Sequence, residues 1–356
     1  MSKAKKSTPT PQSQMTELTK LIAKERKDSA QVFSGETIPK GWELLPTESL
    51  QLNLHIGGFP RGGITVLEGE EGAGKTTTAL GVVALDQRMH PERGRWLILD
   101  VERSITRWFL ESKGVDPDRV ILLREDNAEG YTDSMVRLIE TGEIDGVVLD
   151  SIAAMKPKRV MESSSEKTTI AQVARAMSDH MPRVIGPIGR HNVCAIYLNQ
   201  LRENPGMNFG NPFYGPGGKA PFFYSLLMIR LTKSKLHSRG HLMGVKVTRN
   251  KPFHGPKKDL IYIGFLHNYG IDKAKEIISI GKDLGIVKRL SNPGRTVWTD
   301  QEGTDFEIEG RSLEARYEFL ADNPELTEAM FAHAREVIDE RKLLEPGATI
   351  QQVEEE

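Results

Sequence analysis

A glycine-rich segment that contains a single lysine has the residue types and spacing that most clearly suggest chemistry. Residues 69–76 read Gly-Glu-Glu-Gly-Ala-Gly-Lys-Thr and fit the pattern G-x-x-x-x-G-K-[ST] of a phosphate-binding loop. Glycine lacks a Cβ, so the backbone of such a loop can curl and direct its N–H groups at an anion. The lysine would supply a cation to the phosphates, and the threonine hydroxyl can bind Mg²⁺. The plainer alternative is a glycine-rich turn with a stray lysine.

The segments on either side of the loop favour phosphate binding. Residues 64–67 are a β-branched apolar run that predicts a buried strand, and residues 76–85 predict a helix. The positive N-terminal end of that helix would face the same point as the loop. We therefore expect a bound nucleotide. The residues expected to contact it in this segment are Gly69, Glu70, Glu71, Gly72, Ala73, Gly74, Lys75, Thr76 and Thr77.

Three further apolar runs predict the rest of the sheet. They cover residues 96–100, 146–150 and 193–199, with helical segments between them. Strands that are apolar throughout and alternate with helices indicate an α/β fold, in which a mainly parallel sheet lies between helices. Ligands of such sheets bind at the carboxyl ends of the strands, so the polar residues at those ends must be considered together.

Each of these strand ends carries a residue suited to nucleotide hydrolysis. Asp150 suits the carboxylate that holds Mg²⁺, together with Thr76. Glu102 is a candidate base that orients and deprotonates an attacking water. Asn199 and Gln200 could sense the γ-phosphate. For any one of them alone, capping of a strand end is an equally good explanation.

Two irregular, basic stretches follow the predicted strands. Residues 201–221 are rich in glycine and proline and carry Phe209 beside Arg202 and Lys219, as stacking on single-stranded bases would need; a substrate lid is the alternative. Residues 155–169 are the second stretch. From 204 to 258 the chain has no Asp or Glu and ten Lys or Arg, so one surface should attract polyanions.

Composition limits the protein class. The 356 residues carry a net charge of −1 and are 27% charged and 38% hydrophobic, which is typical of a soluble globular protein of about two domains. Without a long apolar run or a secretory signal, we expect no membrane partner. Cys194 is the only cysteine, which excludes an internal disulfide and a cysteine-based zinc site and fits the reducing cytoplasm.

The pattern divides the chain into four parts. Residues 1–33 form an N-terminal arm whose apolar residues within 15–27 predict a short helix, which either packs back or docks onto a neighbouring subunit. Residues 34–269 form the core and 270–345 a small C-terminal α+β domain. In the latter we predict a helix over 273–289 and a small sheet over 294–308. Residues 346–356 are an acidic tail that should be disordered.

From about residue 45 to 323 the chain resembles the RecA family of homologous-recombination ATPases. The motifs that carry the resemblance occur in family order: PTESLQLNLHIGGFPRGG, GEEGAGKTT, ILDVE, VVLDSIAA, YLNQLR, MNFGNP, GPGG and VKVTRNK. The resemblance implies a RecA-like P-loop ATPase core that uses ATP and Mg²⁺. It also implies a homo-oligomeric filament on single-stranded DNA that pairs with double-stranded DNA, with single-strand-binding and loader proteins as further partners.

Residue roles follow from the resemblance position by position. Glu102 would activate water, with Lys75 and Gln200 completing the catalytic set, and Gln200 would couple ATP to the DNA loop. Phe109 would stack on adenine, while Arg249 and Lys251 would reach the ATP of the next subunit. The DNA-binding residues implied are Arg159, Arg175, Arg202, Met207, Phe209, Gly210, Asn211, Gly217, Gly218 and Lys219.

The sequence departs from the bacterial pattern at several motif positions. Examples are Phe213 and Tyr214 in the second loop, Arg249 in place of a common lysine, and a poor match over 159–170. Such divergence would suit a phage-encoded or otherwise distant member. Two functional alternatives are a RecA-core ATPase acting as a helicase or recombination mediator, and a P-loop kinase of small molecules, which would leave the acid-free basic stretch and the aromatic loop without a role. Neither a bulky partner domain nor cysteine zinc spacing is present to favour the helicase or the mediator.

Overall fold

The computed structural model describes residues 11–26, 31–34, 38–158, 166–203, 213–237, 240–253, 260–266, 270–290 and 295–344. Contacts divide the chain into two compact units, residues 1–43 and 44–356. In the first unit, helix α1 (Pro11–Arg26) covers the predicted helix and leaves the side chains of Met15, Leu18, Leu21 and Ile22 exposed. The boundaries predicted after residues 33, 269 and 345 remain predictions, and the predicted tail 346–356 lies outside the described residues.

A nine-stranded sheet organises the second unit, in the order β13-β12-β11-β10-β3-β7-β6-β4-β5. The strands from β10 to β5 in that order run parallel, and β11, β12 and β13 continue the sheet in antiparallel fashion. The predicted, mainly parallel α/β sheet is therefore confirmed. The strands are β3 (Gly63–Gly69), β4 (Trp96–Asp100), β5 (Val120–Leu123), β6 (Gly146–Asp150), β7 (Cys194–Gln200), β10 (Ser225–His237), β11 (Gly240–Asn250), β12 (Ile261–Leu266) and β13 (Gly270–Ile271).

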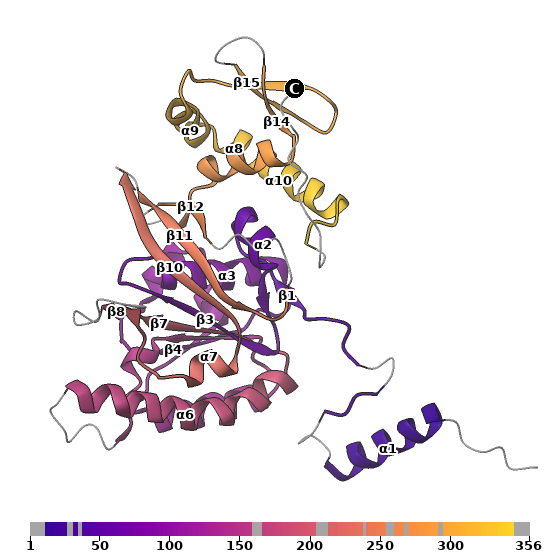
Figure 1. Cartoon of the computed structure of the whole chain (residues 1–356), viewed down its shortest axis with the longest axis vertical. Helices are drawn as coiled ribbons and strands as arrows, with labels where there is room; N and C mark the ends of the chain where they lie inside the picture. The colour runs from indigo at the N-terminus through magenta and orange to yellow at the C-terminus, as the bar shows by residue number, and fades with distance from the viewer. Residues whose placement is uncertain are drawn as a thin grey trace, which may run out of the picture. The chain divides into compact units, whose positions relative to one another are not determined.

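Helices cover both faces of this sheet (Figure 1). Side chains alternate along each strand, so Ile98 of β4 packs in one apolar cluster while Leu97 and Leu99 pack in the other. The first cluster includes residues of α2 (Leu50–Ile56), α3 (Lys75–Met89) and α4 (Arg107–Ser112). The second includes residues of α5 (Ala128–Glu140) and α6 (Glu166–Arg190), against which α7 (Ala220–Tyr224) packs. Two filled layers thus hold the strand ends in fixed positions.

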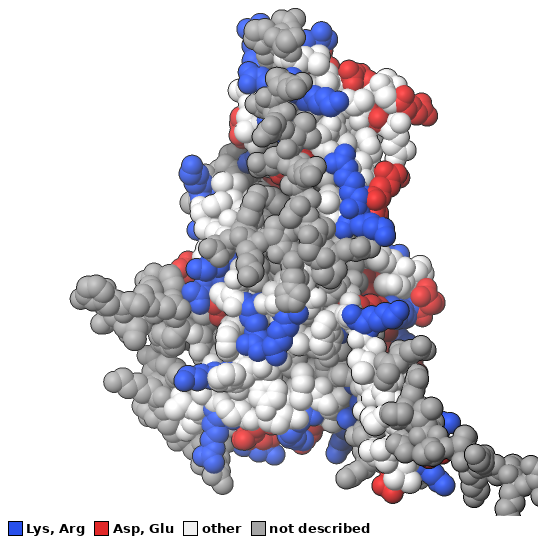
Figure 2. Space-filling view, turned by 45° about the vertical axis from the view of Figure 1, so that its right-hand side comes forward, with Lys and Arg blue, Asp and Glu red and all other residues white. Residues whose placement is uncertain are grey.

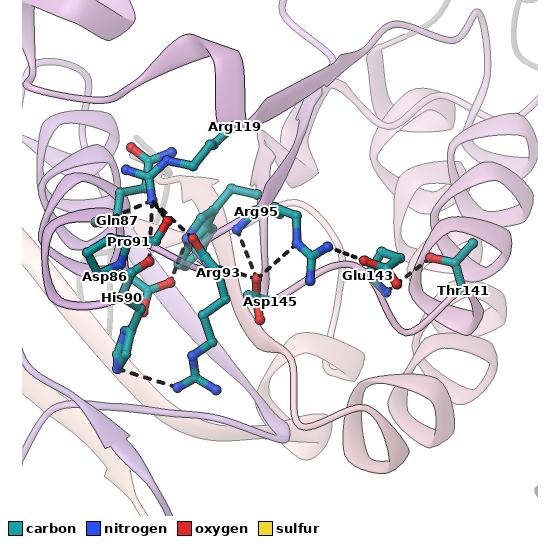
Figure 3. Close-up of polar contacts among 12 residues, drawn as sticks. Asp86, Gln87, His90, Pro91, Arg93, Arg95, Arg119, Thr141, Glu143 and Asp145 are labelled. Atoms are coloured by element: carbon teal, nitrogen blue, oxygen red, sulfur yellow. Dashed lines mark hydrogen bonds and ion pairs between the residues drawn. The ribbon is translucent and has the colours of Figure 1, made fainter.

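A polar network ties together the amino ends of the strands, away from the phosphate loop (Figure 3). One guanidinium nitrogen of Arg119 lies within hydrogen-bond distance of four backbone carbonyls in and after the last turn of α3; the two shortest contacts are to Arg93 at 3.0 Å and Gln87 at 3.1 Å. The Asp145 carboxylate accepts from the backbone N–H groups of Gly94 and Arg95, both at 2.9 Å. The Arg119 contacts thus satisfy carbonyls at and after the end of α3, and Asp145 satisfies two backbone N–H groups before β4.

The C-terminal part has its own apolar core. Helices α8 (Lys273–Asp283), α9 (Leu313–Asp322) and α10 (Pro324–Glu340) pack on the sheet of β14 (Val287–Arg289), β15 (Thr296–Thr299) and β16 (Asp305–Ile308). A sheet over the predicted segment is confirmed. The prediction of a helix over residues 273–289 was wrong at its end. Helix α8 ends at Asp283, because Gly285 takes a left-handed φ of 76° and the chain then enters β14.

Other local differences concern the segment after β7. The apolar residues 222–232 predict a strand, but the structure places residues 222–224 at the end of helix α7, since Pro221 suits the first turn of a helix. The ends of the predicted loop pair as short strands, β8 (Arg202–Glu203) with β9 (Phe213–Tyr214). Residues 204–212 lie outside the described part. Short β1 (Leu44–Leu45) pairs with β2 (Phe59–Pro60). Over the described residues, no helix has the length and apolarity to cross a membrane.

Candidate nucleotide-binding site

The predicted phosphate loop connects the buried strand β3 to helix α3, as its sequence indicated. Gly72 and Gly74 have left-handed φ values of 72° and 93°, which glycine adopts without strain. Gly69 is required for another reason: a Cβ there would lie 2.3 Å from the carbonyl oxygen of Leu231 on the neighbouring strand β10. The loop therefore depends on glycine both for its turn and for its close packing against the sheet.

Lys75 and Thr76 begin helix α3 and point into the site. The Lys75 ammonium donates to the carbonyl oxygens of Gly69 at 2.9 Å and Glu70 at 2.7 Å, and burial lowers its pKa. The Thr76 hydroxyl donates to a carboxylate oxygen of Asp150 at 3.0 Å. The hydroxyl and carboxylate expected to share a metal ion are therefore in direct contact, with oxygen donors of the kind that Mg²⁺ prefers.

Glu102 lies close enough to Asp150 for its negative charge to affect the protonation of Asp150. Burial, followed by the nearby negative charge of Glu102, raises the pKa of Asp150 to about 6. Glu102 accepts a hydrogen bond of 2.5 Å from the hydroxyl of Ser151. A divalent cation beside Asp150 would offset both effects, so the donor set fits Mg²⁺ chemically.

A clasp between the buried Asp100 carboxylate and the more exposed Arg124 side chain fixes the turn that carries Glu102. The Asp100 carboxylate, fully buried at the end of β4, accepts from the backbone N–H of Ser104 at 2.9 Å and of Ile105 at 3.3 Å. Arg124 binds the same carboxylate at 2.7 Å and also donates to the carbonyl of Ile105 at 2.8 Å. Sequence reasoning missed Arg124, which follows β5; nothing in the local pattern marks it.

One cavity of about 550 Å³ joins these groups at the carboxyl edge of the sheet. Its lining includes most of the predicted residues: Glu71, Gly72, Gly74, Lys75, Thr76, Thr77, Glu102, Asp150 and Gln200. It also includes Ser151 and three residues that were not predicted, Lys233, His241 and Phe265. Lys233 belongs to the acid-free basic stretch, but its position at the site depends on the pairing of β10 with β3.

A smaller hollow continues from the cavity, because Thr77 and Phe265 line both. Lys113 lines this hollow, and its ammonium lies 5.4 Å from the centre of the Phe109 ring. Phe109 itself does not line the phosphate cavity. Phe109 does not line the smaller hollow either, and its stacking on adenine remains a prediction.

The remaining predicted residues lie apart from the phosphate cavity. Arg249, near the end of β11, is half-buried, and its guanidinium carbon lies 4.7 Å from the centre of the Phe222 ring. Lys251 and Lys219 are exposed. Arg175 is exposed on α6, where it lines a separate cavity with Asp179 and Arg183.

The structure describes only some of the predicted DNA-binding residues around the two irregular segments. Arg202 is in β8, and Gly217 and Gly218 precede α7. Arg159, Met207, Phe209, Gly210 and Asn211 lie outside the described residues. On the face drawn in Figure 2, Lys and Arg side chains occur across the middle of the molecule, with several Asp and Glu along its right-hand margin.

Comparison with known proteins gives a consistent result. The model of the RecA N-terminal domain family matches residues 15–268. A protein RecA of Porphyromonas gingivalis is 34% identical over 297 residues, which cover 81% of this chain and 83% of that protein. A protein RecA of Bifidobacterium longum is 34% identical over 304 residues, covering 83% of this chain and 72% of the relative. One of Ruminococcus albus is 33% identical, covering 80% and 70% respectively.

Proposed function

The chain belongs to the RecA family, and from this premise we propose that it is an ATP-dependent DNA recombinase that forms a filament on single-stranded DNA and pairs it with homologous duplex. The observation that carries the proposal is the convergence of Lys75, Thr76, Asp150, Glu102 and Gln200 on one cavity. These side chains come from four strand ends, and their residue types match the tasks of phosphate binding, metal binding and water activation.

In this proposal the triphosphate of ATP occupies the cavity beside Lys75. The ammonium, which otherwise donates to two loop carbonyls, turns to the phosphates. Thr76 and Asp150 hold Mg²⁺, which neutralises developing charge when bound. Glu102 accepts a proton from water, and the clasp of Asp100 and Arg124 keeps the Glu102 carboxylate in position. Gln200, at the start of the segment that leads to β8, senses the γ-phosphate.

DNA would bind along the two irregular segments near residues 155–169 and 201–221. Support comes from the basic residues of the acid-free stretch, of which Lys219, Lys235, Lys246 and Lys251 are exposed. We further propose that Arg249 and Lys251 act on the ATP of a neighbouring copy, since neither lines the phosphate cavity of its own chain. The proposal assigns the protein to the cytoplasm of a bacterial or phage-infected cell, where ATP and DNA are both present.

The decisive experiment measures ATP hydrolysis with and without single-stranded DNA at several salt concentrations. We expect DNA to stimulate turnover, and we expect the stimulation to weaken as salt rises, because phosphate contacts release counterions. The Lys75→Ala variant is the matched control for contaminating ATPases. Turnover that is indifferent to single-stranded DNA would contradict the recombinase assignment.

A further inference from the structure

A short helix links the end of the candidate DNA loop to a cation of the shared site. Helix α7 (Ala220–Tyr224) follows Lys219 directly and precedes strand β10. Its Phe222 is 41% exposed, and the Arg249 guanidinium carbon lies 4.7 Å from the centre of that ring. The Nε of Arg249 is buried and has no hydrogen-bond partner among the described residues. The contact with the ring is therefore the described interaction that orients this guanidinium.

The backbone fixes Arg249 relative to strand β10, which begins directly after α7. Arg249 lies opposite Met228 in the antiparallel pairing of β11 with β10. The N–H of Lys251 donates to the carbonyl of Leu226 at 3.0 Å, and the Thr248 hydroxyl donates to the carbonyl of Met228 at 3.2 Å. Any shift of α7 must therefore change the relation between the Phe222 ring and the Arg249 guanidinium.

The segment before α7 packs tightly against the chain's own nucleotide site. A Cβ on Gly215 would lie 2.3 Å from the side-chain nitrogen of Asn199, the neighbour of Gln200 in β7. A Cβ on Gly217 would lie 2.8 Å from Ile152, two residues after Asp150. A displacement of the strand ends by nucleotide would thus press on residues 215–219 and on α7.

We propose that Phe222 is the positioning residue for Arg249. We further propose that α7 couples the nucleotide site and the DNA loop of one chain to Arg249, the cation that this chain places in the site of its neighbour. Cation–π attraction over an aromatic face holds the guanidinium in place without engaging its N–H donors. Apart from the buried Nε, the N–H donors of the guanidinium are thus left for a phosphate. The inference rests on the proposed shared site, since Arg249 needs a neighbour's nucleotide on which to act.

The test uses substitutions that separate the aromatic face from apolar bulk. Phe222→Leu keeps bulk and loses the face, whereas Phe222→Tyr keeps both. We expect Phe222→Leu to lower DNA-stimulated ATP turnover by about 2- to 30-fold, the range for losing a cation–π contact. ATP affinity of the isolated chain and melting temperature should stay unchanged, and Phe222→Tyr should match the parent protein. Parent-like turnover in Phe222→Leu would overturn the proposal.

Mixed filaments then locate the defect. Phe222→Leu and Arg249→Ala lie on the same side of the interface, so their mixture should recover no turnover. The mixture of Phe222→Leu with Glu102→Gln should recover some turnover. At some of its interfaces the Phe222→Leu chain supplies an intact Glu102, and the Glu102→Gln chain supplies an Arg249 that its own Phe222 still positions. Recovery in the first mixture, or none in the second, would overturn the role of Phe222. The mixture of Arg249→Ala/Lys251→Ala with Glu102→Gln tests the shared site alone; if it fails, the shared site is wrong and the inference falls with it.

Discussion

At the residue scale, the site separates two tasks that a single substitution can distinguish. Lys75 is placed to hold phosphates, because its ammonium extends over the loop to the carbonyls of Gly69 and Glu70. Glu102 is placed to act on water, since it lies outside the loop and contacts Ser151. Loss of phosphate binding and loss of proton transfer should therefore have different consequences for the nucleotide-bound state.

We predict that Lys75→Ala abolishes ATP turnover and ATP-dependent DNA binding together. Glu102→Gln should slow hydrolysis by about 10²- to 10⁴-fold, the usual contribution of a general base. It should leave ATP-dependent DNA binding intact, because the phosphates are still held. Turnover and fluorescence-based DNA binding measured on both variants check this. An equal loss of DNA binding in both would contradict the division of tasks.

A second prediction concerns Asp150, whose pKa is raised to about 6 by burial and by the charge of Glu102. Below that pH the carboxyl is protonated, and the proton competes with a metal ion, so Mg²⁺ affinity should fall by up to about tenfold per pH unit. Glu102→Gln removes a like charge, lowers the pKa of Asp150 and shifts the loss to lower pH. Calorimetric titration with Mg²⁺ and a non-hydrolysed ATP analogue, from pH 5 to 8, measures the shift. Identical pH profiles would count against the coupling.

At the element scale, the turn between β4 and α4 is positioned by a residue from another element. Arg124 follows the edge strand β5 and grips both the Asp100 carboxylate and the carbonyl of Ile105. Asp100 in turn caps the backbone N–H groups of Ser104 and Ile105. Glu102 lies inside this closed set of bonds. The pairing of β5 with β4 places Arg124 beside Asp100, and the clasp thereby fixes the position of the candidate base Glu102.

We predict that Arg124→Gln lowers kcat by about 10- to 100-fold with little change in KM, because a small displacement of a catalytic group is costly while phosphate binding is untouched. Arg124→Lys, which can still pair with Asp100, should recover part of the loss. Arg103→Gln is the matched control, since Arg103 lies in the same turn and its ion pair with Asp126 is exposed and worth little. A rise in KM with unchanged kcat would argue against a positioning role.

At the scale of the whole second unit, a buried carboxyl joins the entry helix to the C-terminal part. One oxygen of Glu276 in α8 accepts from the Ser49 hydroxyl at 2.5 Å and from the backbone N–H of Gln51 at 2.7 Å, at the start of α2. Burial raises the pKa of Glu276 to about 7, while Lys273 and Arg335 oppose the shift. The junction between these parts should therefore respond to pH.

The folded chain holds the Glu276 proton more tightly than the unfolded chain, in which this carboxyl has its ordinary pKa of 4.5. The contribution of this group to the free energy of unfolding is therefore fully present below pH 4.5 and is lost as pH rises through about 7. We predict that Glu276→Gln is more stable than the parent at pH 8 by up to about 3 kcal/mol. Its amide oxygen can accept the same two bonds. Urea unfolding at pH 5 and 8 measures the difference, with exposed Glu318→Gln as control. A Glu276→Gln protein that keeps the parent's pH dependence would contradict the assignment.

The sequence by itself determined the parallel sheet, the phosphate loop and most of the cavity lining. These features depend on local patterns: apolar runs before Gly69, Asp150 and Gln200, and the spacing of glycine, lysine and threonine. Parallel strands place their carboxyl ends at one edge, so residues distant in the chain meet there without further information.

Only the tertiary structure decided which residues support and complete that site. The strand order places Lys233 of β10 and Phe265 of β12 in the lining of the cavity. It also places β5 beside β4, so that Arg124 can pair with Asp100. The contact of Phe222 with Arg249 depends on residues 222–224 being helical, although their apolar side chains suited a strand. Glu276 looked like any other charged residue of an amphipathic helix, and its partner Ser49 lies 227 positions earlier. Such pairings are set by packing between elements, which local residue preferences do not encode.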